Sequence, residues 1–331
     1  MRRAGAGCLI CLLTAACGGS RTPTTPSGNG IVVGISSLAQ SYLTEIVNLM
    51  QANSINRDRI SWTDVRAKVA QSAQGAQTIA DTYPAISMAL GFLDDHHSFY
   101  SGASGGAVGN PNARRCAAPG ASTPTMPADV GYVKVGSFSS TVPGADRAFA
   151  DAIQQQIRSA DAAAVVGWIV DVRGNGCGNM WPMVAGVGAV LGEGVAGYFV
   201  SPGGGSTPWR YQGGGSFSGG SLVSQTSMPY QLMRPGTRVA VLTDNLVASS
   251  GEAVVVSFRG RPNTRSFGAA TCGLSTANQS YRLSDGGMLY LTVAVMADRN
   301  RTPYGDSMGP DETVPGDADV VQRAIAWLRG M

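Results

Sequence analysis

The 331-residue sequence is poor in charge, in histidine and in lysine. Asp, Glu, Lys and Arg make up 14% of it and the formal net charge is +3, so it lacks the basic field of a nucleic-acid-binding protein. It holds two lysines (Lys68, Lys134) and two histidines (His96, His97). An imidazole that does acid–base chemistry must therefore belong to His96 or His97. With 44% hydrophobic residues, the chain can still bury a full core.

A long apolar run is missing from the N-terminus as well. The run Cys8–Leu13 is too short to cross a bilayer as a helix. Two arginines precede it and small residues before Cys17 follow it, an order that is typical of an export signal. Residues 1–16 resemble a bacterial lipoprotein signal, with Cys17 as the acylated first residue of the mature protein. An ordinary secretory signal fits the same residues.

Both interpretations predict export. In the first, the protein reaches the bacterial periplasm and a lipid anchor on Cys17 is its one attachment to a membrane, at the outer membrane or the cell surface. Residues 17–30 are rich in Ser, Thr, Pro and Gly and are predicted to be a flexible tether.

Cysteine is also scarce in the part of the chain that is expected to fold. Half of the six cysteines lie in residues 1–17, the signal and the predicted acylation site, which leaves Cys116, Cys177 and Cys272. Three cysteines cannot all pair with one another, and their spacing matches no metal site. One disulfide and one free thiol is a possible arrangement, but the sequence does not select the pair. We expect neither a metal nor another cofactor.

Apolar residues at one-turn spacing predict helices between residues 31 and 100. Leu38, Tyr42, Ile46 and Met50 follow this spacing, a second helix starts near Ser61, and a third pattern extends to residue 92 with a break at Tyr83-Pro84. We interpret residues 31–100 as an N-terminal helical subdomain that leads to both histidines. On their own, two histidines after two acids indicate a helix terminus or a surface turn.

Residues 101–130, rich in Gly, Pro, Ala and Ser, contain no convincing element and form either a disordered insert or a loop that covers an active site. An alternating strand pattern at residues 131–138, an amphipathic helix at 145–160 and a buried strand at 163–172 follow. The order strand–helix–strand predicts a parallel crossover and an α/β fold. Residues 201–235 predict a surface hairpin or a β-excursion beside the cleft.

The predicted strand at 163–172 ends in a glycine-rich turn that extends to Asn179. Glycines at that edge of a parallel strand let backbone amides turn toward a ligand, but such a turn alone is weak evidence, and it is not a dinucleotide-binding fingerprint.

Residues 238–258 combine a strand, a turn and a helix start. An apolar run predicts a buried strand, Thr243-Asp244-Asn245 a turn, and Ala248–Glu252 the N-terminus of a helix. Free N–H groups at such a terminus stabilise a developing oxyanion, so a serine there suits a nucleophile. On this stretch alone, the favoured interpretation is structural: a Ser N-cap with Glu252 completing a capping box.

Five segments in one order carry a resemblance: Leu93–Ser98, Gly131–Val135, Asp171–Asn175, Ala248–Glu252 and Gly309–Asp311. Together they resemble the S41 family of serine peptidases, which includes the C-terminal processing proteases, tricorn protease and retinoid-binding protein modules. The similar region covers nearly all of the mature chain. The resemblance implies a crotonase-like (ClpP/crotonase) α/β catalytic core in residues 131–331, preceded by the helical subdomain.

Motif by motif, the resemblance assigns roles. The family's Ser-x-x-Glu implies Ser249 as the nucleophile, the amide of Ser250 as an oxyanion donor and Glu252 in support. The glycine-rich turn implies the amide of Cys177 or Gly178 as the second donor, and Cys177 stands where the family usually has glycine.

The general base distinguishes two branches of the family. Processing proteases use a lysine after the serine, but the matching stretch here, Gly268–Ser275, has leucine at that position, and both lysines precede the serine. The tricorn-like branch uses a histidine in Asp-x-His followed by Ser or Thr. The resemblance therefore implies His97 as the base, supported by Asp95 and Ser98, and activity rising with a pKa of roughly 6–7.

The third catalytic residue and the substrate are less defined. Asp306 matches the acidic position of the tricorn-like branch, and Asp95 and Glu252 are alternatives. The interval between Ser98 and Gly131 is too short for the PDZ domain of the processing proteases, which needs more than about 80 residues. Substrate selection is then expected from the cleft and the 101–130 loop.

The resemblance implies an exported serine-type peptidase that cleaves peptides or unfolded proteins. Two alternatives stay open: a non-catalytic module on the same scaffold that binds a peptide or an apolar ligand, and a small-molecule esterase or amidase. The sequence does not fix the oligomeric state.

Overall fold

The computed structural model describes residues 34–331. The predicted signal, the acylation site at Cys17 and the tether lie outside these described residues. The chain forms two compact units. The first holds the described residues up to Arg115 together with Ser280–Leu291, and the second holds Cys116–Gln279 and Thr292–Met331. No sequence pattern predicts that Ser280–Leu291 groups with the N-terminal residues.

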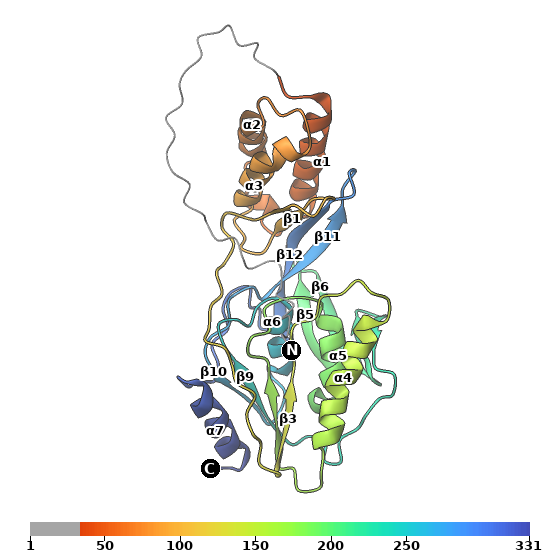
Figure 1. Ribbon diagram of the computed structural model, residues 1–331, viewed down its shortest axis with the longest axis vertical. Helices are drawn as coiled ribbons and strands as arrows, with labels where there is room; N and C mark the ends of the chain where they lie inside the picture. The colour runs from red at the N-terminus through yellow and green to blue at the C-terminus, as the bar shows by residue number, and fades with distance from the viewer. Residues whose placement is uncertain (1–33) are drawn as a thin grey trace, which may run out of the picture. The chain divides into compact units, whose positions relative to one another are not determined.

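The first unit is mainly helical, as the apolar spacing predicts (Figure 1). Its helix α1 buries Tyr42, Ile46 and Met50, three of the four residues on which that prediction rests. Pro84 lies in the first turn of α3, where a missing N–H leaves no hydrogen bond unmade. The elements are α1 (Ser37–Asn53), η1 (Arg57–Arg59), α2 (Trp62–Ser72), η2 (Ala80–Thr82), α3 (Tyr83–Gly91), β1 (Phe99–Ser101) and β2 (Ala107–Val108).

The second unit is built on a parallel sheet in the strand order β13-β10-β9-β4-β3. In chain order its elements are β3 (Val130–Lys134), α4 (Ala145–Ala160), β4 (Gly167–Asp171), α5 (Met180–Leu191), β9 (Arg238–Thr243), α6 (Ser250–Phe258), β10 (Thr264–Gly268), β13 (Glu312–Thr313) and α7 (Asp317–Leu328). The helix predicted at 145–160 is confirmed with the same bounds. The α/β fold is therefore confirmed.

Antiparallel strands complete the second unit between α5 and β9, where the sequence predicts a hairpin or β-excursion. These are β5 (Gly194–Val200), β6 (Ser206–Gln212), β7 (Gly215–Ser218) and β8 (Ser221–Gln225). Two long strands, β11 (Thr276–Arg282) and β12 (Met288–Asp298), continue from one unit into the other. The last residues of β12 pair with β5, and its first residues pair with β1.

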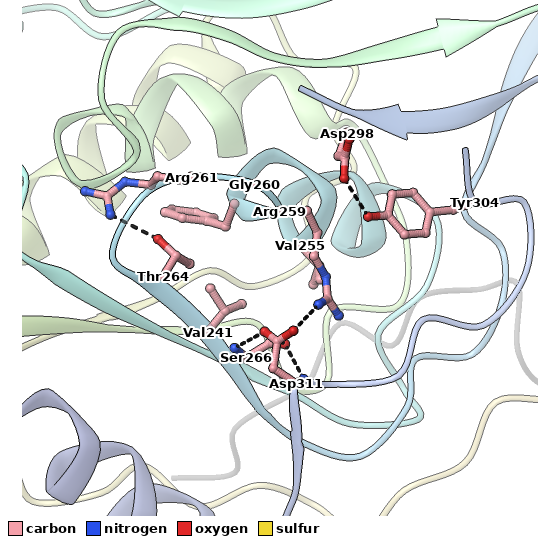
Figure 2. Close-up of a pocket in the computed structure, with 11 residues that line it drawn as sticks. Val241, Val255, Arg259, Gly260, Arg261, Thr264, Ser266, Asp298, Tyr304 and Asp311 are labelled. Carbon is pink, nitrogen blue, oxygen red and sulfur yellow. Dashed lines mark hydrogen bonds and ion pairs between the residues drawn. The ribbon is translucent and has the colours of Figure 1, made fainter. Parts of the chain in front are cut away.

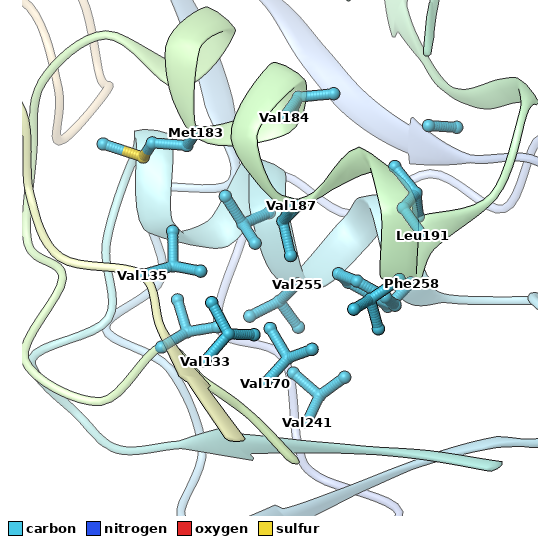
Figure 3. Packing of buried hydrophobic residues seen from close by; sticks show 14 of the residues in the cluster. Val133, Val135, Val170, Met183, Val184, Val187, Leu191, Val241, Val255 and Phe258 are labelled. Atoms are coloured by element: carbon cyan, nitrogen blue, oxygen red, sulfur yellow. The ribbon is translucent and has the colours of Figure 1, made fainter. Parts of the chain in front are cut away.

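The core of the second unit follows from the alternation of side chains along its strands. Val239 and Val241 of β9 face the cluster that includes α4, α5 and α6, whereas Ala240 and Leu242 face α7. Figure 3 shows valines of β3, β4 and β9 packed against α5 and α6. Because both faces of the sheet are covered, the sequences of its strands are almost continuously apolar. This rigid sheet carries the loops described next at the carboxyl ends of β4 and β9.

Candidate active site

The serine turn, residues 244–252, joins β9 to α6 and presents Ser249 at the helix start. The backbone of Ser249 has φ 54° and ψ −113°, a conformation that side-chain-bearing residues rarely adopt. Ser249 is half-buried, and Ala248 and Ser250 on either side are buried. The surrounding structure therefore imposes this backbone and holds the hydroxyl at the helix N-terminus.

Glu252 fixes the serine turn from inside. Its side chain is fully buried, and its Oε2 accepts the amide N–H of Ser249 at 2.9 Å. The other three donors come from a loop that follows β10: the Thr271 hydroxyl at 2.5 Å and the amides of Gly273 at 3.0 Å and Leu274 at 2.7 Å. Burial raises the pKa of Glu252 to about 7, although these hydrogen bonds favour the charged carboxylate.

The glycine-rich turn after β4 packs directly on the serine turn. The carbonyl of Asn175 accepts the amide of Ala248 at 3.0 Å. A Cβ at Gly251 would lie 2.1 Å from that same carbonyl oxygen, so no larger residue fits there without moving the backbone. The Asn175 side chain is fully buried and donates to the carbonyls of Val135 and Gly136 at 3.2 and 3.1 Å, which fixes the turn to the end of β3.

Gly178 provides the second close contact in the glycine-rich turn. Its φ is +120°, and a Cβ there would lie 1.9 Å from the carbonyl oxygen of Phe138. The left-handed conformation thus falls on Gly178, and the cysteine at position 177 needs no positive φ. Gly176 donates its amide to Ser137 Oγ, and Asn179 donates to Phe138. The amides of Cys177 and Gly178, between these two anchors, stay the candidate oxyanion donors.

A buried ion pair supports the start of the glycine-rich turn. Asp171 is fully buried and pairs with Arg173 at 2.7 Å, and the Tyr132 hydroxyl donates to it at 2.8 Å. Burial opposes ionisation, but the hydrogen bonds from Arg173 and the charge of Lys134 keep the pKa of Asp171 below its usual value. The Lys134 ammonium lies 3.2 Å from Asp171 and donates to the Arg173 carbonyl, so it serves this network.

The histidine turn, residues 94–98, belongs to the first unit. Asp95 is buried and its carboxylate accepts the amides of His97 at 2.9 Å and Ser98 at 2.7 Å, and the Ser98 hydroxyl at 2.7 Å. His97 is half-buried. Burial lowers the pKa of His97 to about 4, and the negative charge of Asp95 acts in the opposite direction. This value is lower than the 6–7 expected from the sequence, because the sequence does not reveal burial.

His96 has a different environment. Its side chain is exposed and its Nδ1 lies 2.7 Å from the carbonyl of Asn112. Asp306 in the second unit is exposed and its carboxylate accepts the amide of Ser307 at 2.7 Å. The structure thus groups Ser249, Ser250 and Glu252 with the glycine-rich turn in one unit, and Asp95, His97 and Ser98 in the other.

One feature beside the serine turn escaped the sequence prediction. Cys116 and Cys272 form a disulfide across 156 positions of the chain. The sequence left the pairing of the three cysteines open, and no local pattern connects residue 116 with residue 272. The pairing follows from the tertiary fold, which places the segment after Arg115 against the loop that follows β10.

A cavity of about 350 Å³ lies at the other end of α6 (Figure 2). Arg259, Asp298, Tyr304 and Asp311 line it, and each takes part in an ion pair or a hydrogen bond with a neighbour. Since α6 spans nine residues, this cavity lies about 13 Å along the helix from the Ser249 end. It is separate from the serine turn.

Within residues 34–331, no helix has the length and apolarity required to span a membrane. No group of three or more His, Cys, Asp or Glu side chains in that range is arranged to hold a metal ion.

Known proteins resemble the chain over most of its length. A nisin-resistance protein from Lactococcus lactis subsp. lactis is 27% identical over 294 residues, which cover 88% of this chain and 87% of that protein. A lipoprotein from Streptococcus agalactiae has a similar structure, with a TM-score of 0.69 at 18% identity, over 89% of this chain and 98% of that one. The photosystem II D1 C-terminal processing protease gives a TM-score of 0.57 at 17% identity, over 87% of this chain and 97% of that one.

At these identities the two structural similarities establish a shared fold. The sequence also identifies the family. The family model of peptidase family S41 matches residues 129–314, more than half of the chain. That range contains both the glycine-rich turn and the serine turn. The chain belongs to peptidase family S41.

Proposed function

We propose that this protein is a serine-type peptidase with Ser249 as the nucleophile and His97 as the general base. The observation that carries the proposal is the backbone of Ser249, with φ 54° at the N-terminus of α6. An ordinary N-cap serine has an extended backbone, and Ser36 before α1 is an example, with φ −67° and ψ 154°. The capping box predicted for Ser249 and Glu252 is present, and the strained backbone of Ser249 favours a catalytic role in addition to capping.

The proposed chemistry uses groups from both turns. Ser249 Oγ attacks the carbonyl carbon of the substrate while the neutral imidazole of His97 accepts the hydroxyl proton. The amide of Ser250, at the first position of α6, has no partner within the helix, and together with the amide of Cys177 or Gly178 it would stabilise the oxyanion. His97 then returns the proton to the leaving amine, and water hydrolyses the acyl-enzyme by the same route. The lowered pKa of His97 keeps the imidazole neutral at pH 7.

The third catalytic residue is proposed from the resemblance as Asp306. Asp95 has a claim of its own, because its negative charge raises the pKa of His97 and would stabilise the imidazolium. The Glu252 carboxylate is engaged by four donors on the serine turn and the loop after β10, which supports a structural role. Comparing Asp306→Asn with Asp95→Asn separates the first two: the group that acts on the imidazole lowers kcat when its charge is removed.

The proposed substrates are peptides or unfolded proteins, and the proposed location is the bacterial periplasm, with a lipid anchor at Cys17. The sequence signal in residues 1–16 supports export. The relative from Lactococcus is named for nisin resistance, so nisin belongs in the substrate panel. No nucleic acid is expected as a partner, because the net charge is only +3.

The decisive experiment is labelling of the purified mature protein with a fluorophosphonate probe, which reacts with activated serines. We expect labelling of the wild type, its loss in Ser249→Ala and His97→Ala, and its retention in His96→Ala. A panel of peptides, esters and amides then identifies the substrate class, and hydrolysis of esters alone would favour an esterase. A folded wild type that is never labelled would favour the non-catalytic binding module.

A further inference from the structure

The Cys116–Cys272 disulfide joins two segments of the second unit that are distant in sequence. Cys116 is the first residue of that unit after the chain leaves the first. Cys272 is almost fully buried, at 3% exposure, and its amide donates to the carbonyl of Val247 in the serine turn at 2.8 Å. One end of the disulfide is therefore bound directly to the serine turn.

The residues around Cys272 are the ones that hold Glu252. We name residues 271–274 the clamp loop, because three of the four hydrogen bonds to the Glu252 carboxylate come from Thr271, Gly273 and Leu274. The fourth comes from the amide of Ser249. A displacement of the clamp loop would therefore move the carboxylate that fixes the backbone of Ser249.

A polar bridge runs beside the disulfide and joins the same segments. Asn245 in the serine turn accepts the amide of Ala117 at 3.2 Å and donates to the carbonyl of Thr271 at 3.3 Å. The segment that begins at Cys116 is thus tied to the clamp loop by a covalent bond and to the serine turn by Asn245. Asn245 is four residues before the proposed nucleophile, and Cys272 donates its amide to Val247, two residues before it.

We propose that the Cys116–Cys272 disulfide is a positioning element for the nucleophile. It holds the clamp loop in the place where its hydroxyl and amides fix Glu252, and Glu252 in turn fixes Ser249. The two cysteines are positioning residues that act through the clamp loop and touch no substrate. This inference rests on the proposed function, in which Ser249 attacks the substrate.

The same arrangement makes activity depend on the redox state. A dithiol reductant breaks the S–S bond, supplies two electrons and two protons to form the thiols of Cys116 and Cys272, and is itself oxidised to a disulfide. The clamp loop then loses its covalent attachment, and the serine turn loses part of its support.

A double-mutant cycle tests the proposal. Cys116→Ser/Cys272→Ser removes the disulfide. Thr271→Val removes the hydroxyl that donates a hydrogen bond to Glu252, and Thr271→Ser keeps that hydroxyl. We expect each of the first two changes to lower kcat about 10-fold to 100-fold with KM within about twofold, since the chemical geometry is disturbed and not the substrate contacts. Thr271→Ser should restore most of the loss. In the combined variant the effects should fall short of additive, because both act through the clamp loop.

Two controls separate positioning from general stability. Val321→Ala removes a buried contact of α7 at the opposite face of the sheet and should leave kcat unchanged. Hydrogen exchange of the Ser249, Gly273 and Leu274 amides provides a readout that needs no activity. It should accelerate in Cys116→Ser/Cys272→Ser and after mild reduction of the folded wild type, a treatment that also serves if the double variant does not fold.

The outcomes distinguish the two proposals. A wild type without labelling or turnover contradicts the proposed function, and exchange at the three amides then still decides the role of the disulfide. Exchange unchanged after the S–S bond is broken, or a kcat that stays within twofold, overturns the positioning role. Additive losses of kcat in the double-mutant cycle also overturn it, because they would show that the disulfide and Thr271 affect Ser249 independently of each other.

Discussion

The histidine turn and the serine turn are two solutions to one problem, the fixing of a reactive side chain on a loop. Each is built around a buried carboxylate that accepts backbone amides. Asp95 binds residues two and three positions further along the chain. Glu252 binds Ser249, three positions back, and residues 19 to 22 positions ahead. In these hydrogen bonds Asp95 joins near neighbours in sequence, whereas Glu252 joins segments that are distant in sequence. The backbone of the histidine turn also has distant partners, because Asn56 donates to the carbonyl of Asp94 and Asn110 to that of Asp95.

This difference predicts where the molecule is sensitive to substitution. In the histidine turn, substitutions of residues 95–98 disturb the hydrogen bonds to the Asp95 carboxylate most directly. The serine turn also requires the glycine-rich turn after β4 and the clamp loop after β10, so changes at distant positions can displace Ser249.

Ser249→Ala should have the largest effect. Removal of the attacking oxygen is expected to lower kcat about 10⁵-fold or more, because the remaining groups supply only binding and oxyanion stabilisation. The measurement is turnover of a cleaved peptide together with fluorophosphonate labelling. Ser257→Ala, on the same helix, is the matched control and should keep its activity despite losing the hydrogen bond from Trp209. Full activity in Ser249→Ala would place the nucleophile elsewhere.

His97→Ala should lower kcat by about 10⁴-fold, and His96→Ala should change it less than twofold. The pH profile carries a second prediction. Only the neutral imidazole accepts a proton, so activity is present above the pKa of His97 and is lost as the pH falls through about 4. The kcat/KM of the wild type, measured between pH 3 and 8, shows this loss of activity at acidic pH. If the residual activity of His97→Ala also falls near pH 4, the assignment is contradicted.

Gly251→Ala tests the contact between the serine turn and the glycine-rich turn. The new Cβ would lie 2.1 Å from the Asn175 carbonyl oxygen, so the two turns must separate. We expect kcat to fall about 100-fold, as Ser249 and the oxyanion donors lose their alignment, and the free energy of unfolding to fall by about 1–3 kcal/mol. Gly136→Ala is the control, because a Cβ there has no atom within 4 Å. Equal activity in both variants would show that the contact does not serve catalysis.

Glu252→Gln tests the long-range turn through its charge. The amide of glutamine has one acceptor oxygen for four donors, so two of them would face an NH₂ group, and we expect a loss of about 2–3 kcal/mol of folding free energy. The folded pKa of Glu252 is raised from 4.5 to about 7. Its titration therefore contributes stability below pH 4.5, and this contribution is lost as the pH rises through about 7.

Denaturant unfolding of both proteins between pH 4 and 8 provides the measurement for Glu252→Gln. The stability of the wild type relative to the variant should decline with pH in this window, with a slope of at most about 1.4 kcal/mol per pH unit. A difference that does not vary with pH would show that Glu252 has the same pKa in the folded and unfolded states.

The same contrast explains what the sequence predicts and what it does not. The α4 helix, the β9 strand and the start of α6 follow from local periodicity and capping residues, and their bounds agree with the structure. The Ser-x-x-Glu and Asp-x-His motifs identify the candidate residues because each motif lies within a few positions. The clamp loop and the Cys116–Cys272 pair arise from contacts 19 to 156 positions apart, for which a single sequence holds no periodic signal. Burial of His97, which sets its pKa, is equally a property of the folded chain.

The smallest effect concerns two serines that lie in equivalent places beside the reactive residues. In the histidine turn, the Ser98 hydroxyl donates to Asp95 at 2.7 Å. In the serine turn, the Ser250 hydroxyl is buried and finds no hydrogen-bond partner within residues 34–331. Ser98→Ala should therefore lower the free energy of unfolding by about 1–2 kcal/mol, whereas Ser250→Ala should leave it unchanged or raise it by about 1 kcal/mol. Thermal unfolding of the two variants measures the difference. Equal destabilisation by both would mean that the Ser250 hydroxyl is bonded in solution, and the contrast between the bonded hydroxyl of Ser98 and the unbonded hydroxyl of Ser250 would lose its support.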